Sequence, residues 1–481
     1  MTTPLSPRVR AAAGIVPSAR QLAWQHREFT AFLHVGMNTM TDREWGLGHE
    51  DPGLFDPAGV DTDQWMRAVS AAGARGVILT AKHHDGFCLW PSAHTGHTVA
   101  ASPWRGGRGD LVRESAESAA RHGLAFGIYL SPWDRTEARY GSGSAYDDFF
   151  VAQLTELLTD YGPISTVWLD GANGEGPDGR VQMYDWDRYY ETVRRLQPDA
   201  VISVCGPDVR WCGNEAGHTR ADEWSVVPAS LRDAERVASR SQQQDDGVFA
   251  RLVRSDEDDL GSREALEAND DDLVWYPAEV NTSIRPGWFH HPAEDDRVRS
   301  ADELFDIYRR SVGGNSGFLL NVPPDATGVI SAPDVESLRG LGALVAELDE
   351  RDRTARGALT LAGREVAVPS RSAPLHLREG DTVVVRWDEP VEIDGVILDE
   401  DISRGQLVDR IEIDAEDADG TTRTVLAVGA VGYRRIAEIP RRRVRAVRLR
   451  LVTARDVVHL TRLSLLTPSG RLAGSSGPRL A

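Results

Sequence analysis

Short apolar runs that end in polar or ionisable residues recur between residues 29 and 324. They occupy residues 29–36, 76–82, 124–133, 165–171, 200–206, 222–227, 273–281 and 316–324. Runs of this length, rich in Val, Ile, Leu and Phe and bounded by turn residues, are typical of β-strands. The pattern therefore predicts eight strands.

Amphipathic segments with helix boundary signals lie between these runs. The segments 61–73, 110–123 and 147–162 each end at a glycine, and 300–310 begins with a capping box of Ser300 and Glu303. Strands that alternate with helices indicate parallel pairing. Eight such units predict an α/β fold, a (β/α)8-like (TIM) barrel. A doubly wound open sheet is the alternative, although no G-x-G-x-x-G motif follows a strand.

The chain changes character from about Gly357. Helical periodicity fades, and β-rich runs alternate with acidic or glycine-containing turns, as in 382–388, 391–399, 409–417 and 446–452. This pattern predicts an antiparallel β-sandwich. We expect the barrel over residues 1–355, the sandwich over 356–468 and a flexible tail over 469–481. Only Trp387 supplies an aromatic platform in the sandwich, which favours a buttressing role over sugar binding.

Composition and charge narrow the classes of function. The chain has 481 residues, 41% hydrophobic and 27% charged, and no apolar run near the roughly 18 residues that a membrane span requires. A formal net charge of −20 argues against a nucleic-acid partner. Three cysteines leave an odd thiol, and the N-terminal residues lack a continuous apolar segment. We therefore expect a cytoplasmic protein without a signal peptide, a membrane partner or a nucleic-acid partner.

Ionisable and aromatic residues follow the predicted strands. In a barrel of this kind the site is built at the C-terminal ends of the strands. Such positions are held by His34, His83, His84, Tyr129 and Asp170. Tryptophans lie beside polar loop motifs at positions 45, 133, 211 and 288. Flat aromatic faces beside carboxylates and histidines suit a sugar, so the pattern favours a carbohydrate substrate.

Eight motifs, in order, carry a family resemblance. They are FLHVGMNTM, REWG, AKHHDGFCLWPS, YLSPWD, VWLDGANGEG, WCGNEAG, SIRPGWFHH and GGNSGFLLNVPPDATG. Together they resemble glycoside hydrolase family 29, the retaining α-L-fucosidases, in which a β-sandwich follows the barrel. The compact GNEAG is more similar to the branch that cleaves α-1,3 and α-1,4 fucosyl linkages in branched glycans. The resemblance implies an exo-acting hydrolase with a fucosylated oligosaccharide or glycoconjugate as its substrate.

The resemblance also implies two catalytic carboxyl groups. Retaining hydrolysis needs one to attack the anomeric carbon and one to protonate the leaving oxygen. Asp170, at the end of a predicted strand, matches the family's nucleophile, and Glu215 in WCGNEAG best matches the acid/base. The acid/base position varies across the family, and other glutamates also lie near strand ends, namely Glu44, Glu175, Glu223 and Glu279. Glu223 is the main rival.

Further residues match those that hold the sugar in the family. They are His34, Glu44, Trp45, His83, His84 and Tyr129. Trp288 looks like the residue that packs on the C6 methyl of fucose. Lys82, the only lysine, precedes the paired histidines without a predicted role. A carbohydrate-binding protein that has lost catalysis is the second class of function, and the presence of both carboxylates argues against it.

A metal-dependent hydrolase is a further alternative, because His83, His84 and Asp85 could join His34 around zinc. Adjacent residues on an extended strand point to opposite sides, however, and zinc sites usually use spaced ligands. We therefore expect no metal and no other cofactor.

Overall fold

The computed structural model describes residues 5–240 and 259–469. The chain forms two compact units, one made by residues 14–342 and the other by residues 1–13 together with 343–481. The boundary expected near residue 355 stays a prediction. The tail expected at 469–481 lies, apart from its first residue, outside the described residues.

Eight parallel strands form the centre of the first unit. In the order of the sheet they are β5 (Val201–Val204), β4 (Thr166–Leu169), β3 (Ala125–Leu130), β2 (Gly76–Lys82), β1 (Phe29–Leu33), β10 (Gly317–Asn321), β9 (Ala278–Ser283) and β6 (Arg210–Trp211). A parallel bridge between Ser203 and Val209 brings the two ends of the sheet together. β1, β2 and β10 are buried at every residue, as strands inside a layer of helices must be. The predicted barrel is confirmed.

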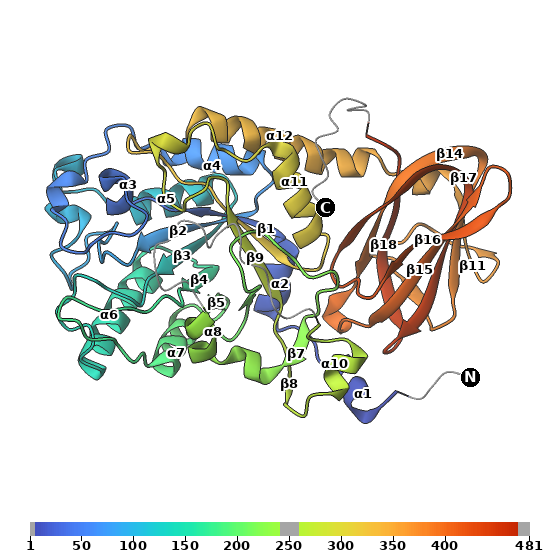
Figure 1. Ribbon diagram of the computed structural model, residues 1–481, viewed down its shortest axis with the longest axis horizontal. Coiled ribbons are helices and arrows are strands. Elements are labelled where there is room, and N and C mark those ends of the chain that lie inside the picture. The colour runs from blue at the N-terminus through green and yellow to red at the C-terminus, as the bar shows by residue number, and fades with distance from the viewer. Residues whose placement is uncertain (1–4, 241–258, 470–481) are drawn as a thin grey trace. The chain divides into compact units, whose positions relative to one another are not determined.

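Helices flank these strands or lie in the segments that connect them (Figure 1). They are α2 (Ala19–Arg27), α3 (Met37–Thr41), α4 (Thr62–Ala71), α5 (Leu111–Arg121), α6 (Ser144–Asp160), α7 (Trp186–Leu196), α8 (Ala234–Arg240), α10 (Arg263–Glu267), α11 (Ala301–Ser311) and α12 (Ala332–Glu350). The glycines predicted to end α4, α5 and α6 adopt positive φ angles of 94°, 69° and 78°. The capping box is also confirmed, since the Ser300 hydroxyl and the Glu303 carboxylate each accept from the other residue's backbone N–H.

Two of the strand predictions were wrong. The run 222–227 does not enter the barrel, because Val226–Pro228 (β7) pairs antiparallel with Leu273–Trp275 (β8) in a separate two-stranded sheet. The run 273–281 is divided at Pro277, which has no N–H to donate to a ladder, and only its second part becomes β9. The sixth barrel position belongs to β6, whose two residues are too few to produce an apolar run.

The second unit is an antiparallel β-sandwich, and α1 (Pro7–Ala13) from the start of the chain belongs to the same unit. Its strands are β11 (Ala358–Leu361), β12 (Arg364–Glu365), β13 (Leu375–Leu377), β14 (Thr382–Glu400), β15 (Val408–Asp417), β16 (Thr422–Val428), β17 (Arg435–Ala454) and β18 (Val458–Leu466). The predicted sandwich is therefore confirmed. Trp387 is buried in its core and donates its indole N–H to the Arg353 carbonyl at 3.1 Å. It offers no exposed platform for a sugar ring.

Candidate active site

A cavity of about 550 Å³, its open mouth included, lies at the C-terminal ends of the barrel strands. Its walls are Phe32, His34, Trp45, His83, His84, Tyr129, Trp168, Asp170, Ala172, Val204, Trp211, Glu215, Asn281 and Trp288. Of the residues predicted for the site, Glu44 alone is not among these walls. Five wall residues were not named from the sequence, namely Phe32, Trp168, Ala172, Val204 and Asn281, because residues inside strand runs resemble core residues and alanine carries no functional group.

Val204 is a wall residue in an unusual conformation. Its φ is 68°, in the left-handed region that a β-branched residue rarely adopts. Such a conformation costs on the order of 1–3 kcal/mol and persists only where the surroundings impose it. The Val204 N–H donates to the Val209 carbonyl at 3.1 Å, next to the bridge that joins the ends of the sheet.

Asp170 follows β4 and is held by two donors. The Tyr129 hydroxyl donates to its Oδ2 at 2.8 Å, and the Ala172 backbone N–H donates to its Oδ1 at 2.8 Å. Burial, reinforced by Asp170, raises the pKa of Tyr129 well above its usual value, so that this hydroxyl keeps its proton. The His84 Nε2 lies 3.9 Å from Oδ2. Asp170 is thus oriented on both oxygens while its side chain stays 20% exposed.

The hydrogen-bond network assigns the tautomers of His84 and His34. The Ser131 hydroxyl donates to the Trp133 carbonyl at 2.7 Å, so it must accept from Nδ1 of His84, also at 2.7 Å. The Asn321 amide donates to the Ser283 hydroxyl and the Trp288 carbonyl, which leaves its oxygen to accept from Nδ1 of His34 at 2.8 Å. In both rings the Nε2 is therefore left as an acceptor.

His83 has the opposite tautomer. The Asn38 amide N–H donates to Nδ1 of His83 at 3.3 Å, so the ring carries its proton on Nε2. Burial lowers the pKa of His34 to about 3 and of His84 to about 4, and it lowers that of His83 well below its usual value. All three rings are neutral at neutral pH. Together they offer two acceptors and one donor, a set that suits sugar hydroxyls.

The side chains of His83 and His84 do not point to opposite sides, as the alternation of side chains along a strand predicted. β2 ends at Lys82, so the two histidines lie in the turn that follows, and both rings line the same cavity with centroids 4.1 Å apart. Within residues 5–240 and 259–469, no three or more His, Cys, Asp or Glu side chains are grouped in a way that could hold a metal ion.

Glu215 lies at the cavity wall against Trp288. The Trp288 indole N–H donates to its Oε2 at 3.1 Å, although the two residues are 73 positions apart. The Trp288 ring also packs at 5.1 Å from the His34 ring. The carboxyl group of Glu215 therefore sits among residues that belong to the same cavity as Asp170.

The rival glutamates lie elsewhere. Glu223 is buried between Arg210 and Arg220, and these guanidinium groups outweigh burial and lower its pKa. Glu279 is buried and accepts from the Trp168 indole at 2.8 Å, and burial raises its pKa to about 7. Glu175 is exposed. None of these three carboxyl groups lines the cavity.

Glu44 contacts the loop that carries Trp288. Its two oxygens accept from the backbone N–H groups of Trp288 and Phe289, the latter at 3.3 Å, and Oε2 also lies 3.0 Å from Nε2 of His291. Sequence reasoning missed His291 because its partners lie 247 and 249 residues away in the chain.

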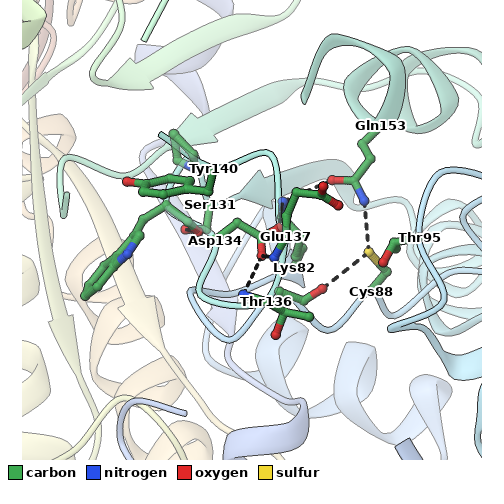
Figure 2. Close-up of polar contacts among 12 residues, drawn as sticks. Lys82, Cys88, Thr95, Ser131, Asp134, Thr136, Glu137, Tyr140 and Gln153 are labelled. Carbon is green, nitrogen blue, oxygen red and sulfur yellow. Dashed lines mark hydrogen bonds and ion pairs between the residues drawn. The ribbon is translucent and has the colours of Figure 1, made fainter. Parts of the chain in front are cut away.

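Lys82 has a structural partner on the next loop of the barrel. Its Nζ donates to Asp134 Oδ2 at 2.8 Å and to Gln153 Oε1 at 3.0 Å, and Figure 2 shows the three side chains converging. The Asp134 Oδ1 accepts from the backbone N–H groups of residues 136 and 137. The Gln153 amide also donates to the Cys88 thiol at 3.2 Å. The only lysine therefore ties the end of β2 to the loop after β3 and does not line the cavity.

Comparison with known proteins decides the family. The sequence model of the family described as alpha-L-fucosidase matches residues 49–350. The chain belongs to the alpha-L-fucosidase family. The family predicted from the eight motifs is thus confirmed. An alpha-L-fucosidase of this family is a glycoside hydrolase.

Individual fucosidases resemble the chain over most of its length. An Arabidopsis thaliana protein named alpha-L-fucosidase 1 is 45% identical over 327 residues, which cover 67% of this chain and 59% of the relative. A solved structure from Bacteroides ovatus, ascribed to the alpha-L-fucosidases, is 40% identical with a TM-score of 0.85, and the match covers 100% of this chain and 78% of that one. A glycoside hydrolase 29 family member from a rumen bacterium is 34% identical with a TM-score of 0.79, over 96% and 78% of the two chains.

No helix in the part of the chain that the structure describes is long and apolar enough to cross a bilayer. The cytoplasmic location stays a prediction.

Proposed function

We propose that this protein is a retaining exo-α-L-fucosidase in which Asp170 is the nucleophile and Glu215 the acid/base. The observation that carries the proposal is that both carboxyl groups line one cavity together with three neutral histidines. A retaining glycosidase needs two carboxyl groups on either side of the scissile bond. The rival acids, Glu223 and Glu279, are engaged outside that cavity.

In the first step Asp170 attacks the anomeric carbon of the fucosyl group. The glycosidic bond breaks, and Glu215 gives its proton to the departing oxygen, which leaves a β-fucosyl ester on Asp170. Tyr129 and the Ala172 N–H hold the attacking carboxylate in place, so the Asp170 side chain loses little conformational freedom when the reaction begins. In the second step Glu215 takes a proton from water, and the water oxygen displaces Asp170. Two inversions return α-L-fucose.

The histidines define the orientation of the sugar. His34 and His84 each present an Nε2 acceptor, and His83 presents an Nε2 donor, so the three rings can bind hydroxyls of one sugar in a single orientation. Trp45 stands edge-on to the His84 ring at 5.4 Å and adds an aromatic wall. Glu44 acts on the sugar indirectly, through the loop that it holds.

Trp288 supplies the wall for the C6 methyl group. Its indole N–H donates to Glu215, which leaves the ring face as apolar surface. The centroids of the Trp288 and Phe32 rings lie 6.4 Å apart. A single methyl group in an apolar pocket is worth about 1–3 kcal/mol, so this wall gives moderate preference for fucose over its 6-hydroxylated analogue.

The substrate class is a glycan with a terminal α-1,3- or α-1,4-linked fucose on a branched core. The support for this linkage is the compact GNEAG motif, residues 213–217, which contains Glu215 and begins two residues after β6. A panel of branched and linear fucosylated glycans tests the assignment. We expect release of fucose from branched α-1,3 and α-1,4 substrates and little from linear α-1,2 substrates. Preferential cleavage of α-1,2 linkages contradicts the linkage, and absence of fucose release from every substrate contradicts the function.

A further inference from the structure

His291 joins two loops of the barrel through two carboxylates. Its Nδ1 lies 2.7 Å from Asp42 Oδ1, and its Nε2 lies 3.0 Å from Glu44 Oε2. Asp42 and Glu44 follow β1, whereas His291 lies in the loop after β9, residues 284–291. An ionised carboxylate only accepts hydrogen bonds, so both ring nitrogens of His291 donate. The geometry is that of an imidazolium cation.

The charges around His291 support that state. Asp42 and Glu44 face it from the first loop, and Glu294 adds a third negative charge from the short 3-10 helix Pro292–Glu294. The hydrogen bond to Glu44 raises the pKa of His291 to about 9, against a partial burial that would lower it. A raised pKa means that the contact is fully present below the usual histidine pKa and is lost as the pH rises through about 9.

Glu44 links His291 to the loop that carries Trp288. Both Glu44 oxygens accept from the backbone of the 284–291 loop, at the N–H groups of Trp288 and Phe289. The approach is close, since a Cβ atom at Gly287 would lie 2.7 Å from Glu44 Oε2. The Trp288 indole then donates to Glu215 Oε2 at 3.1 Å. An unbroken series of contacts thus leads from His291 to the proposed acid/base.

We propose that His291 is a positioning residue for the hydrolysis: its ring holds Glu44 against the 284–291 loop and so keeps the Trp288 indole on Glu215. The inference rests on the proposed function, because it takes Glu215 as the group that exchanges protons with the leaving oxygen. His291 itself does not line the cavity.

The pH dependence of kcat/KM separates this role from a general structural one. The test substrate is a fucosylated glycan, whose leaving oxygen needs the proton of Glu215, and each variant is compared with the wild type at the same pH so that the titration of Glu215 itself cancels. At pH 7, His291→Gln should lower kcat/KM by about 10- to 100-fold, the order of loss that follows a small displacement of active-site groups. This difference from the wild type should disappear as the pH rises through about 9, where the wild-type ring loses its charge. On α-L-fucosyl fluoride, whose leaving group needs no proton, the same variant should lose little activity.

His291→Arg keeps a cation at every pH in this range. It should retain more activity than His291→Gln on the glycan at pH 7, and this advantage should persist above pH 9. His122→Gln is the matched control, since it removes another histidine paired with a carboxylate, at 3.4 Å from Asp63, at the end of α5. Its pH profile should coincide with that of the wild type. A difference between His291→Gln and the wild type that is equally large on the fluoride, or that persists unchanged above pH 9, overturns the proposal.

Carbon-13 NMR of histidine-labelled enzyme gives a second test that does not depend on activity. The resonance missing from the His291→Arg spectrum should titrate near pH 9 in the wild type. A titration at or below the usual histidine pKa contradicts the cationic contact of His291 even if the enzyme is an active fucosidase. If the wild type hydrolyses no fucoside while this resonance titrates near 9, the proposed function fails and the cationic contact stands.

Discussion

Replacing Lys82 by methionine should destabilise the barrel strongly. The side chains of Lys82 and Asp134 are 0% and 2% exposed, and their charged atoms are 2.8 Å apart. At an effective dielectric constant of about 20, charges at that distance attract by about 6 kcal/mol. The Lys82→Met chain leaves Asp134 buried with only its two backbone donors, at 3.0 and 2.8 Å. Because these donors offset part of the loss, we expect about 3–5 kcal/mol in the free energy of unfolding.

Urea unfolding followed by tryptophan fluorescence reports the stability of the barrel, because all tryptophans except Trp387 lie within residues 14–342. Arg67→Met is the control: it removes an ion pair with Asp61 whose side chains are 58% and 47% exposed. Exposed pairs of this kind are worth about 0–1 kcal/mol. A double variant, Lys82→Met with Asp134→Asn, should recover much of the lost stability, because the asparagine side chain carries no charge and its oxygen can still accept from both backbone N–H groups. A loss below about 1 kcal/mol in Lys82→Met, equal to the control, refutes the reasoning about the buried pair.

Three further predictions concern the site. Glu215→Ala should slow cleavage of natural glycans far more than cleavage of an activated aryl fucoside, whereas Glu223→Ala should lack this dependence on the leaving group; the reverse behaviour would move the acid/base to Glu223. Trp288→Ala should reduce the preference for fucosides over 6-hydroxylated analogues by about 1–3 kcal/mol, read as the ratio of the two kcat/KM values, and an unchanged ratio removes the methyl-packing role. Tyr129→Phe removes a hydrogen bond to a charged group worth about 1.5–3 kcal/mol and should lower kcat/KM by roughly 10- to 150-fold, and a loss below about threefold contradicts the role of Tyr129 in holding Asp170.

Much of the fold follows from local signals in the sequence. The glycines at 73, 123 and 162 and the Ser300 capping box mark helix boundaries through chemistry that acts within a few residues. The sixth strand could not be found this way. Arg210–Trp211 is a strand only because β9 lies beside it, and the run 222–227 has strand character that a hairpin with β8 uses instead.

The candidate site could likewise be predicted only in part. The cavity residues that follow the strands could be named, because motifs at strand ends mark them, whereas wall residues inside the strand runs, such as Phe32 and Trp168, could not. The groups that set their protonation could not, since each contact joins distant segments: Asn321 reaches His34 across 287 residues, and Ser131 reaches His84 across 47. Lys82 shows the same limit, because nothing in its neighbours in sequence indicates Asp134 or Gln153 as partners.

The central claim is a double displacement at Asp170, and the anomeric form of the first-formed sugar tests it most directly. Proton NMR during hydrolysis of an aryl α-L-fucoside, read before mutarotation, should show α-L-fucose first. Asp170→Gly should be nearly inactive and should form β-fucosyl azide when azide is added, because azide can occupy the space of the missing carboxylate. Initial release of β-L-fucose by the wild type would contradict the account, since it would mean that water attacks directly and that Asp170 is at most a general base.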